Sequence, residues 1–192
     1  MLFSKDDIVQ NNEDIDTELR NDNVIVASKE QSNATIYNIT EKCDLSKYIK
    51  SFENDIEIIS QGAFSMHQLV KYIVSILPQP CNIYATTWAT SETIVSTLIS
   101  MKEQKMIDNC YFLFDHRVLK YRPNAYLLFE KNFKCKILSI HAKICVIESP
   151  GISVRIVGSG NWTRNDKVEV YSISSNQSIC NYYRTYITNE LT

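Results

Sequence analysis

Two residues of the stretch 137–148, His141 and Lys143, have side chains suited to chemistry on a phosphate diester. The stretch reads ILSIHAKICVIE, an apolar pattern typical of a β-strand, and residues two apart on a strand project from the same face. We therefore expect His141 and Lys143 to project together. A histidine can act as nucleophile or proton carrier, and a fixed cation beside it can bind phosphate oxygens and stabilise a pentavalent transition state.

A glycine-rich corner follows the next predicted strand. It spans residues 158–161, with the sequence GSGN. Glycine lets the backbone approach an anion closely, and the side chains of Ser159 and Asn161 can donate hydrogen bonds to the same phosphate. Turn formation alone is the alternative role for both residues.

Four further residues are candidates for contact with the substrate. Trp162 comes directly after the corner and can stack on a base or a sugar, with packing beneath the loop as the alternative, and Thr163 follows it. Arg117 and Lys120 come after the predicted strand 110–115 and can line a groove for phosphates. A solvated loop is the alternative for these two.

His141, Lys143 and the corner resemble the HxK…D…GSxN signature of the phospholipase D superfamily, in particular its small bacterial nucleases with one motif per chain. The resemblance covers residues 82–171, roughly half of the chain. Family members use a later acidic residue to hold and orient the nucleophilic histidine, so the resemblance gives this role to Glu169. Glu148 stands where the family usually has Asp, and we interpret it as structural.

The resemblance implies a mechanism that uses two histidines. One attacks phosphorus and forms a phosphohistidine, while the other protonates the leaving oxygen and then activates water. Because the chain carries one His-x-Lys motif, we expect a homodimer in which two copies of His141, Lys143 and Asn161 form one active site on a two-fold axis. The mechanism needs no cofactor, and the sequence has no Cys/His spacing typical of a metal site. We therefore expect activity that survives chelation.

The order of predicted elements favours an α/β fold. Strands at 82–87 and 110–115 alternate with a helix over 65–77 and a second helix capped by Ser91. This alternation predicts a mixed, largely parallel β-sheet flanked by helices on both faces, which is also the phospholipase D-like fold that the resemblance implies. Ligands bind such folds near the carboxyl ends of the strands.

The first 60 residues differ in charge from the rest. Residues 1–60 carry 6 Lys/Arg and 13 Asp/Glu, a net charge of −7, whereas residues 61–192 carry 14 and 9, a net charge of +5. We expect an acidic N-terminal segment over 1–60, disordered to about residue 22 with short strands at 23–28 and 34–39, and a catalytic domain over 61–192. The basic domain fits a polyanionic partner, with ordinary surface charge as the alternative.

The favoured function is a metal-independent nuclease that cleaves DNA or RNA. The sequence has no run of about 18 apolar residues and its start lacks the apolar core of a signal peptide, so we expect no membrane partner and a cytoplasmic location, with the six scattered cysteines as free thiols. A phospholipase acting on lipid headgroups is one alternative. A catalytically weak nucleic-acid-binding module of the same fold is another, and a plain structural domain is a third.

Overall fold

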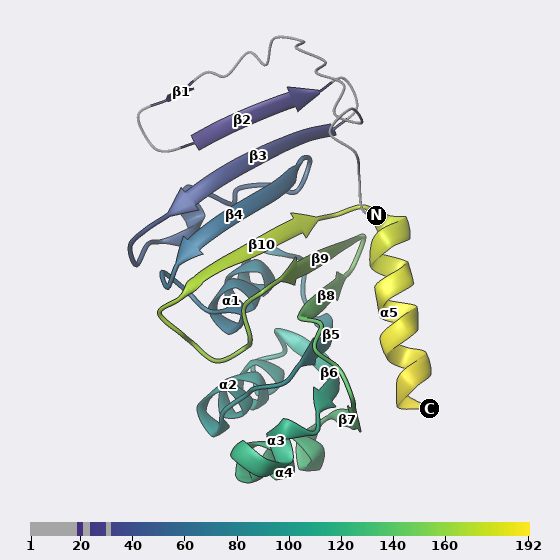
Figure 1. Ribbon diagram of the computed structural model, residues 1–192. Helices are drawn as coiled ribbons and strands as arrows, with labels where there is room; N and C mark the ends of the chain where they lie inside the picture. The colour runs from purple at the N-terminus through teal and green to yellow at the C-terminus, as the bar shows by residue number, and fades with distance from the viewer. Residues whose placement is uncertain (1–18, 21–23, 30–31) are drawn as a thin grey trace, which may run out of the picture.

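The computed structural model describes residues 19–20, 24–29 and 32–192. Ten strands form one sheet in the order β1-β2-β3-β4-β10-β9-β8-β5-β6-β7 (Figure 1). The strands are β1 (Leu19–Arg20), β2 (Val24–Lys29), β3 (Ser32–Ile39), β4 (Asp55–Gln61), β5 (Cys81–Thr87), β6 (Ile107–Asp115), β7 (Lys134–Leu138), β8 (Ile144–Ser149), β9 (Ile152–Gly158) and β10 (Val168–Ser174). The helices are α1 (Met66–Ile76), α2 (Glu92–Glu103), α3 (Arg117–Tyr121), α4 (Pro123–Asn132) and α5 (Gln177–Leu191), and a 3₁₀ turn spans Leu45–Lys47.

The sheet is mixed but mostly antiparallel, so the prediction of a largely parallel sheet is wrong. Among the described strands, six of the nine neighbouring pairs are antiparallel, and only β3–β4, β5–β6 and β6–β7 are parallel. The strand–helix alternation holds from β4 to β7. After β7 the chain forms the β8–β9 hairpin, whose turn contains Gly151 at φ 84°, a conformation that glycine adopts without strain. β10 then inserts between β4 and β9, antiparallel to both.

Helices cover both faces of the sheet, as predicted. On β5, Ile83 and Ala85 belong to the main core, to which α1, α2 and α4 contribute, whereas Tyr84 belongs to a second core beneath α5. This alternation follows from the two-residue period of a strand. Figure 1 shows α5 on the side of the sheet opposite to α1 and α2. None of the described helices is long and apolar enough to cross a membrane.

Local sequence signals account for the two helices that flank β5. Ser65 caps α1 in a capping box with Gln68, and the Ser91 side chain accepts from the Ile94 amide at the start of α2. Such caps satisfy amide groups that have no partner within the helix. Both helices begin where the sequence predicts, and they position the polar carboxyl end of β5 between them.

The described part of the N-terminal segment continues the same sheet. The two predicted strands are confirmed as β2 and β3, and β3 pairs in parallel with β4. Ile39 and Ile49 are buried in the main core, so this segment packs on the rest through both hydrogen bonds and apolar contacts. Apart from Leu19–Arg20 in β1, the prediction of disorder to about residue 22 falls outside the described residues.

Candidate active site

His141 and Lys143 lie in the link between β7 and β8, not on a strand. The predicted continuous strand 137–148 is interrupted at residues 139–143, because β7 is the edge strand beside β6 whereas β8 pairs with β5. The link therefore has to cross the ends of two strands. The expectation that strand pleating aligns the two side chains is wrong, although the link brings them together by another route.

Side chains at the ends of two parallel strands hold this link. Asp115, the last residue of β6, accepts a hydrogen bond from the Ile140 amide at 3.3 Å. Thr86, near the end of β5, donates its hydroxyl to the Ala142 carbonyl at 2.7 Å and accepts from the Ile144 amide at 3.1 Å. The catalytic candidates thus lie at the carboxyl ends of β5 and β6, where ligands of α/β folds are expected.

The His141 side chain is exposed and the Lys143 side chain is buried against it. Lys143 Nζ lies 3.2 Å from each ring nitrogen of His141 and donates to the His141 carbonyl at 2.7 Å. Lys143 is only 7% exposed, and this burial lowers its pKa below the usual value, with the charge of Arg117 acting in the same direction and Glu169 and Asp115 opposing it. A cation is therefore fixed beside an accessible nucleophile.

The glycine-rich corner packs directly on this link. The Gly158 amide, at the end of β9, donates to the Lys143 carbonyl at 3.1 Å. A Cβ atom at Gly158 would collide with the Val170 carbonyl, and one at Gly160 would collide with the Tyr171 hydroxyl. Glycine is required at both positions because β10 passes immediately below the corner.

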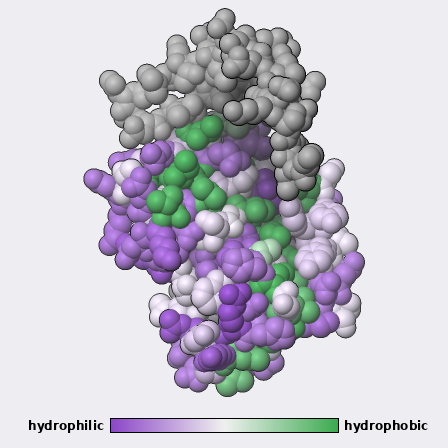
Figure 2. Space-filling view, viewed as in Figure 1, coloured by the Kyte–Doolittle hydropathy of each residue, from purple (hydrophilic) through white to green (hydrophobic). Residues whose placement is uncertain are grey.

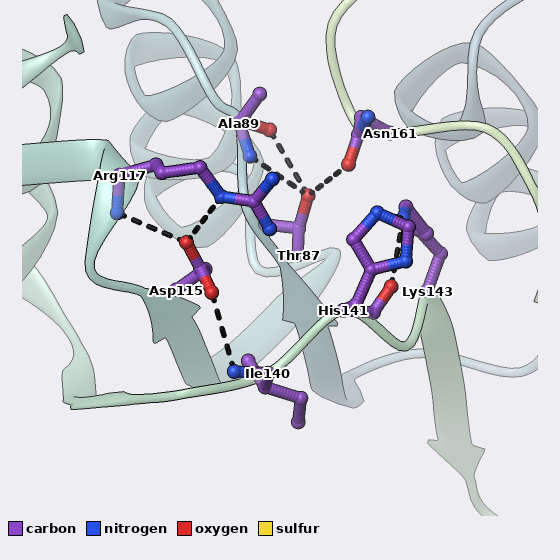
Figure 3. A network of polar contacts seen from close by, with 8 residues as sticks. All are labelled: Thr87, Ala89, Asp115, Arg117, Ile140, His141, Lys143 and Asn161. Carbon is purple, nitrogen blue, oxygen red and sulfur yellow. Dashed lines mark hydrogen bonds and ion pairs between the residues drawn. The ribbon is translucent and has the colours of Figure 1, made fainter.

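Asn161 projects from the corner toward the link. Its Oδ1 lies 3.4 Å from the Thr87 hydroxyl, and its Nδ2 donors have no partner among the residues that the structure describes. Figure 3 shows Asn161, Thr87, Arg117 and His141 around one space. Thr87 is absent from the sequence-based candidates, although the polar end of the predicted strand 82–87 was the signal that could have identified it.

Ser159 and Glu169 bond to each other, and the predicted bond from Glu169 to His141 is not formed within the described chain. The Ser159 hydroxyl donates to one carboxylate oxygen of Glu169, and Asn165 Nδ2 donates to the other. The Val170 amide also donates to Ser159 Oγ at 3.1 Å. Glu169 is buried on the α1 face of β10, beneath the corner, so its carboxylate is directed at the corner and supports it from below.

Trp162 is fully buried, so its ring is not accessible to a nucleotide. Its ring centroid lies 4.7 Å from that of Phe112 on β6 and 6.4 Å from that of His67 on α1. The structure therefore contradicts the stacking role and favours the alternative, packing beneath the loop. The large apolar surface of the indole explains this position, because burying it stabilises the corner against the core.

An open cavity of about 660 Å³ lies beside the catalytic candidates, and two of the other three substrate-binding candidates line it. Arg117 and Thr163 line the cavity, whereas Lys120 lies on the exposed side of α3 with its Nζ 5.4 Å from the Tyr121 ring. The cavity is lined by Trp88, Ala89, Arg117, Tyr121, Arg122 and Thr163. Trp88, which follows β5 directly, is a second residue that the sequence reasoning missed.

Arg117 is held rigidly at the boundary between the cavity and the catalytic candidates. Its Nε donates to Asp115 Oδ1 at 2.5 Å, and its guanidinium lies 4.7 Å from the centroid of the Trp88 ring. The hydrogen bond with Arg117 lowers the pKa of Asp115 to about 2, so this carboxylate stays charged and keeps the guanidinium in place. The Nη donors of Arg117 have no hydrogen-bond partner among the described residues and face the space shown in Figure 3.

Glu148 lies at the far end of β8 from the catalytic candidates. It accepts hydrogen bonds from the Tyr84 hydroxyl and from Arg184 Nη1, both at 3.0 Å. These contacts join the sheet to α5, which supports the structural interpretation of Glu148. Within the described residues, no group of three or more His, Cys, Asp or Glu side chains is placed to hold a metal ion.

Comparison with known proteins supports the fold. No protein-family model matches the chain, and no curated protein matches it. Among solved structures, the chain is similar to polyphosphate kinase from Porphyromonas gingivalis, with a TM-score of 0.53 and 16% sequence identity. The similarity covers 78% of this chain and 29% of the kinase chain, so the chain spans less than a third of that protein. At this identity the likeness shows a shared fold alone.

Proposed function

We propose that the chain is a phosphodiesterase that cleaves nucleic acid through a phosphohistidine intermediate on His141. The observation that carries the proposal is the contact between the exposed imidazole of His141 and the buried ammonium of Lys143 at the carboxyl ends of β5 and β6. A phosphate above the imidazole meets the ammonium and the free Nδ2 donors of Asn161. These donors stabilise the charge that develops on the nonbridging oxygens.

The reaction proceeds in two displacements at phosphorus. A ring nitrogen of His141 forms a bond to phosphorus, the bond to the leaving oxygen breaks, and that oxygen takes a proton from a second histidine. The second histidine then removes a proton from water, the resulting hydroxide attacks phosphorus, and the N–P bond breaks. The products are a phosphomonoester and an alcohol, and both histidines return to their starting state.

The second histidine comes from a second copy of the chain in this proposal. An apolar strip beside the site supports a two-fold dimer: Val168 is 63% exposed, Val170 50% and Ile59 41%. Val170 and Ile59 are neighbours across β10 and β4, and the Val170 amide is bonded to Ser159. Figure 2 shows hydrophobic surface over the region of β4 and β10. Helix α5 packs on β5 to β9, and among the described residues the strip stays exposed next to the catalytic candidates, where an isologous contact can form.

The charges around the site favour nucleic acid as the substrate. Lys143, Arg117 and Arg122 lie along the link and its adjoining cavity, and residues 61–192 carry a net charge of +5. Several cations in a row match the repeated phosphates of a polynucleotide. Aromatic side chains in the same cavity suit the bases.

Cleavage in the presence of EDTA tests this function. Plasmid DNA, a single-stranded oligonucleotide and RNA are incubated with the wild type, with His141→Ala and with His116→Ala, an exposed histidine whose side chain makes no capping hydrogen bond. We expect cleavage by the wild type and by His116→Ala. For His141→Ala we expect the rate of cleavage to fall by at least about a thousandfold.

Three results would contradict this function. Equal cleavage by His141→Ala would remove His141 from the mechanism. Hydrolysis of phospholipid vesicles with intact nucleic acid would support the phospholipase alternative. Binding of nucleic acid by the wild type without cleavage of any substrate would support the binding-module alternative.

A further inference from the structure

The cavity beside His141 has the size and the lining of a nucleotide-binding site. Its volume of about 660 Å³ lies within the range of small-molecule sites, roughly 300 to 1,000 Å³. The lining combines two aromatic side chains, Trp88 and Tyr121, with two arginines, Arg117 and Arg122, and the hydroxyl of Thr163. The mechanism proposed for His141 uses none of these five side chains.

Arg117 can bind a phosphate at the end of the cavity nearest the catalytic candidates, because its guanidinium is already held in place. Asp115 and the Trp88 ring fix its guanidinium. Among the described residues Nε is the only guanidinium nitrogen with a hydrogen-bond partner, so the Nη groups can donate to two oxygens of one phosphate. Arg117 is also close enough to Lys143 to lower the pKa of that ammonium. Two neighbouring cations can bind two phosphates in sequence, with Lys143 on the scissile one and Arg117 on the next.

Tyr121 is the second aromatic side chain of the cavity lining, with Lys120 Nζ 5.4 Å from the centroid of its ring. Its side chain is 56% exposed at the end of α3, although Tyr is a residue that normally buries much of its ring. A base that enters the cavity can stack on this ring, and stacking tolerates any base because every base has a π-face.

The groove continues beyond Tyr121 and Arg122. A second open cavity of about 510 Å³ shares these two residues and extends past Ser91 and Asn124, with Glu92 as an acidic member of its lining. A continuous path of this kind fits a strand that enters and leaves, and it does not fit a single enclosed nucleotide.

We infer that this cavity binds the unpaired nucleotide next to the scissile phosphate, and that the substrate is therefore single-stranded nucleic acid. Within a duplex both faces of a base are covered by its neighbours, so a base reaches a protein ring only when it is unpaired or displaced. Arg117 binds the phosphate of this nucleotide and Tyr121 stacks on its base. The inference rests on the proposed function, because it takes Lys143 as the contact of the scissile phosphate.

Binding to the His141→Ala protein, measured by fluorescence anisotropy at one salt concentration, tests the inference. Three ligands of equal length are compared: a single-stranded oligonucleotide, its duplex and a fully abasic single strand. We expect the single strand to bind about tenfold tighter than the other two. Adding Tyr121→Ala should weaken single-strand binding about tenfold and leave abasic binding within about twofold. Tyr182→Ala, an exposed tyrosine on α5, is the matched control and should change neither.

Tryptophan fluorescence gives a second readout that does not depend on Tyr121. The chain has two tryptophans, and Trp162 is fully buried, so a base in the cavity quenches mainly Trp88. We expect the single strand to quench the emission, the abasic strand to leave it unchanged, and Trp88→Phe to abolish the quenching.

Two results would overturn the inference. One is duplex binding as tight as single-strand binding, and the other is a loss in Tyr121→Ala that is equal for the normal and abasic strands. Failure of the proposed function looks different: the wild type would cleave nothing while Tyr121 and Trp88 still report a bound base. Cleavage by the wild type with no effect of Tyr121→Ala would reject this inference and leave the proposed function standing.

Discussion

The Ser159 hydroxyl donates to the Glu169 carboxylate, and this bond ties the glycine-rich corner to β10. Ser159 Oγ meanwhile accepts from the Val170 amide. The hydroxyl hydrogen is thus engaged with a carboxylate, while the Nδ2 donors of Asn161 have no partner among the described residues. The two neutral residues of the corner therefore differ in role: Ser159 fixes its position together with Glu169, and Asn161 is the residue that we propose to bind the phosphate.

Ser159→Ala and Asn161→Ala should separate stability from activity. Ser159→Ala leaves a buried carboxylate short of one donor, so we expect the free energy of unfolding to fall by about 1–3 kcal/mol with little change in the rate of cleavage. Asn161→Ala should keep the stability and lower the rate about a hundredfold, as for the loss of one oxyanion donor. Urea denaturation and cleavage assays on both variants check this. A stable but inactive Ser159→Ala protein would contradict the assignment.

The rate of cleavage should fall at high pH because of Lys143. Only the charged ammonium stabilises the transition state, and burial lowers the pKa of Lys143 below its usual value of 10.5. The charged form is present below this lowered pKa and is lost as pH rises through it. A pH–rate profile of the wild type should therefore decline at a lower pH than an exposed lysine would give. Lys143→Arg keeps its charge throughout, so its profile should lack this decline. The same decline in both proteins would assign it to another group.

Mixing wild-type and His141→Ala chains should reveal whether the site is shared. If two copies of His141 are needed and the chains pair at random, only dimers of two wild-type chains are active. Equal amounts of the two chains, unfolded and refolded together, then give about a quarter of the activity of the same total of wild type. Half of the activity would show that each chain works alone.

A charge in the apolar strip should disrupt the proposed dimer. Val170→Asp places a charge on a 50% exposed position of the strip and should shift sedimentation toward the monomer, with a loss of activity that higher protein concentration restores. Glu57→Lys, on the same face of β4 and opposite Ser172, changes charge outside the apolar strip and should leave the dimer intact.

Asp115 should stabilise the fold in a pH-dependent manner. Its pKa is lowered from 3.8 to about 2, chiefly by the hydrogen bond from Arg117. The unfolded chain therefore takes up the proton first, so the stabilisation is present above about 3.8 and is lost as pH falls through about 2. Asp115→Asn should lower the free energy of unfolding by about 1–2 kcal/mol at neutral pH, with the difference vanishing toward pH 2. Asp166→Asn, at a 95% exposed side chain, should show no such difference in urea denaturation.

The sequence predicts the features that depend on local interactions. Ser65 and Ser91 begin helices because their hydroxyls cap amides three residues ahead, and such spacing is visible in the sequence. The continuous apolar run CYFLFD at residues 110–115 likewise predicts a strand covered on both faces, and β6 is largely buried along this run. The GSGN corner is recognisable because only glycine fits where β10 passes below it.

The features that the sequence does not predict depend on contacts between distant residues. The break at 139–143 is held by Asp115, 25 residues before Ile140, and by Thr86, 56 residues before Ala142. No periodicity within the stretch reveals these bonds. The insertion of β10 between β4 and β9 makes two of the six antiparallel pairs, and it joins strands that are far apart in the sequence. The burial of Trp162 likewise depends on its contact with Phe112.

Isolation of the covalent intermediate tests the proposed role of His141 most directly. Wild-type protein is mixed with substrate, quenched in base, which preserves phosphohistidine, digested and analysed by mass spectrometry. We expect the peptide that contains His141 to carry a nucleic-acid fragment joined through its phosphorus, with this adduct more abundant when hydrolysis is slowed and absent from His141→Ala. Cleavage by the wild type with no adduct on His141, together with undiminished cleavage by His141→Ala, would contradict this role.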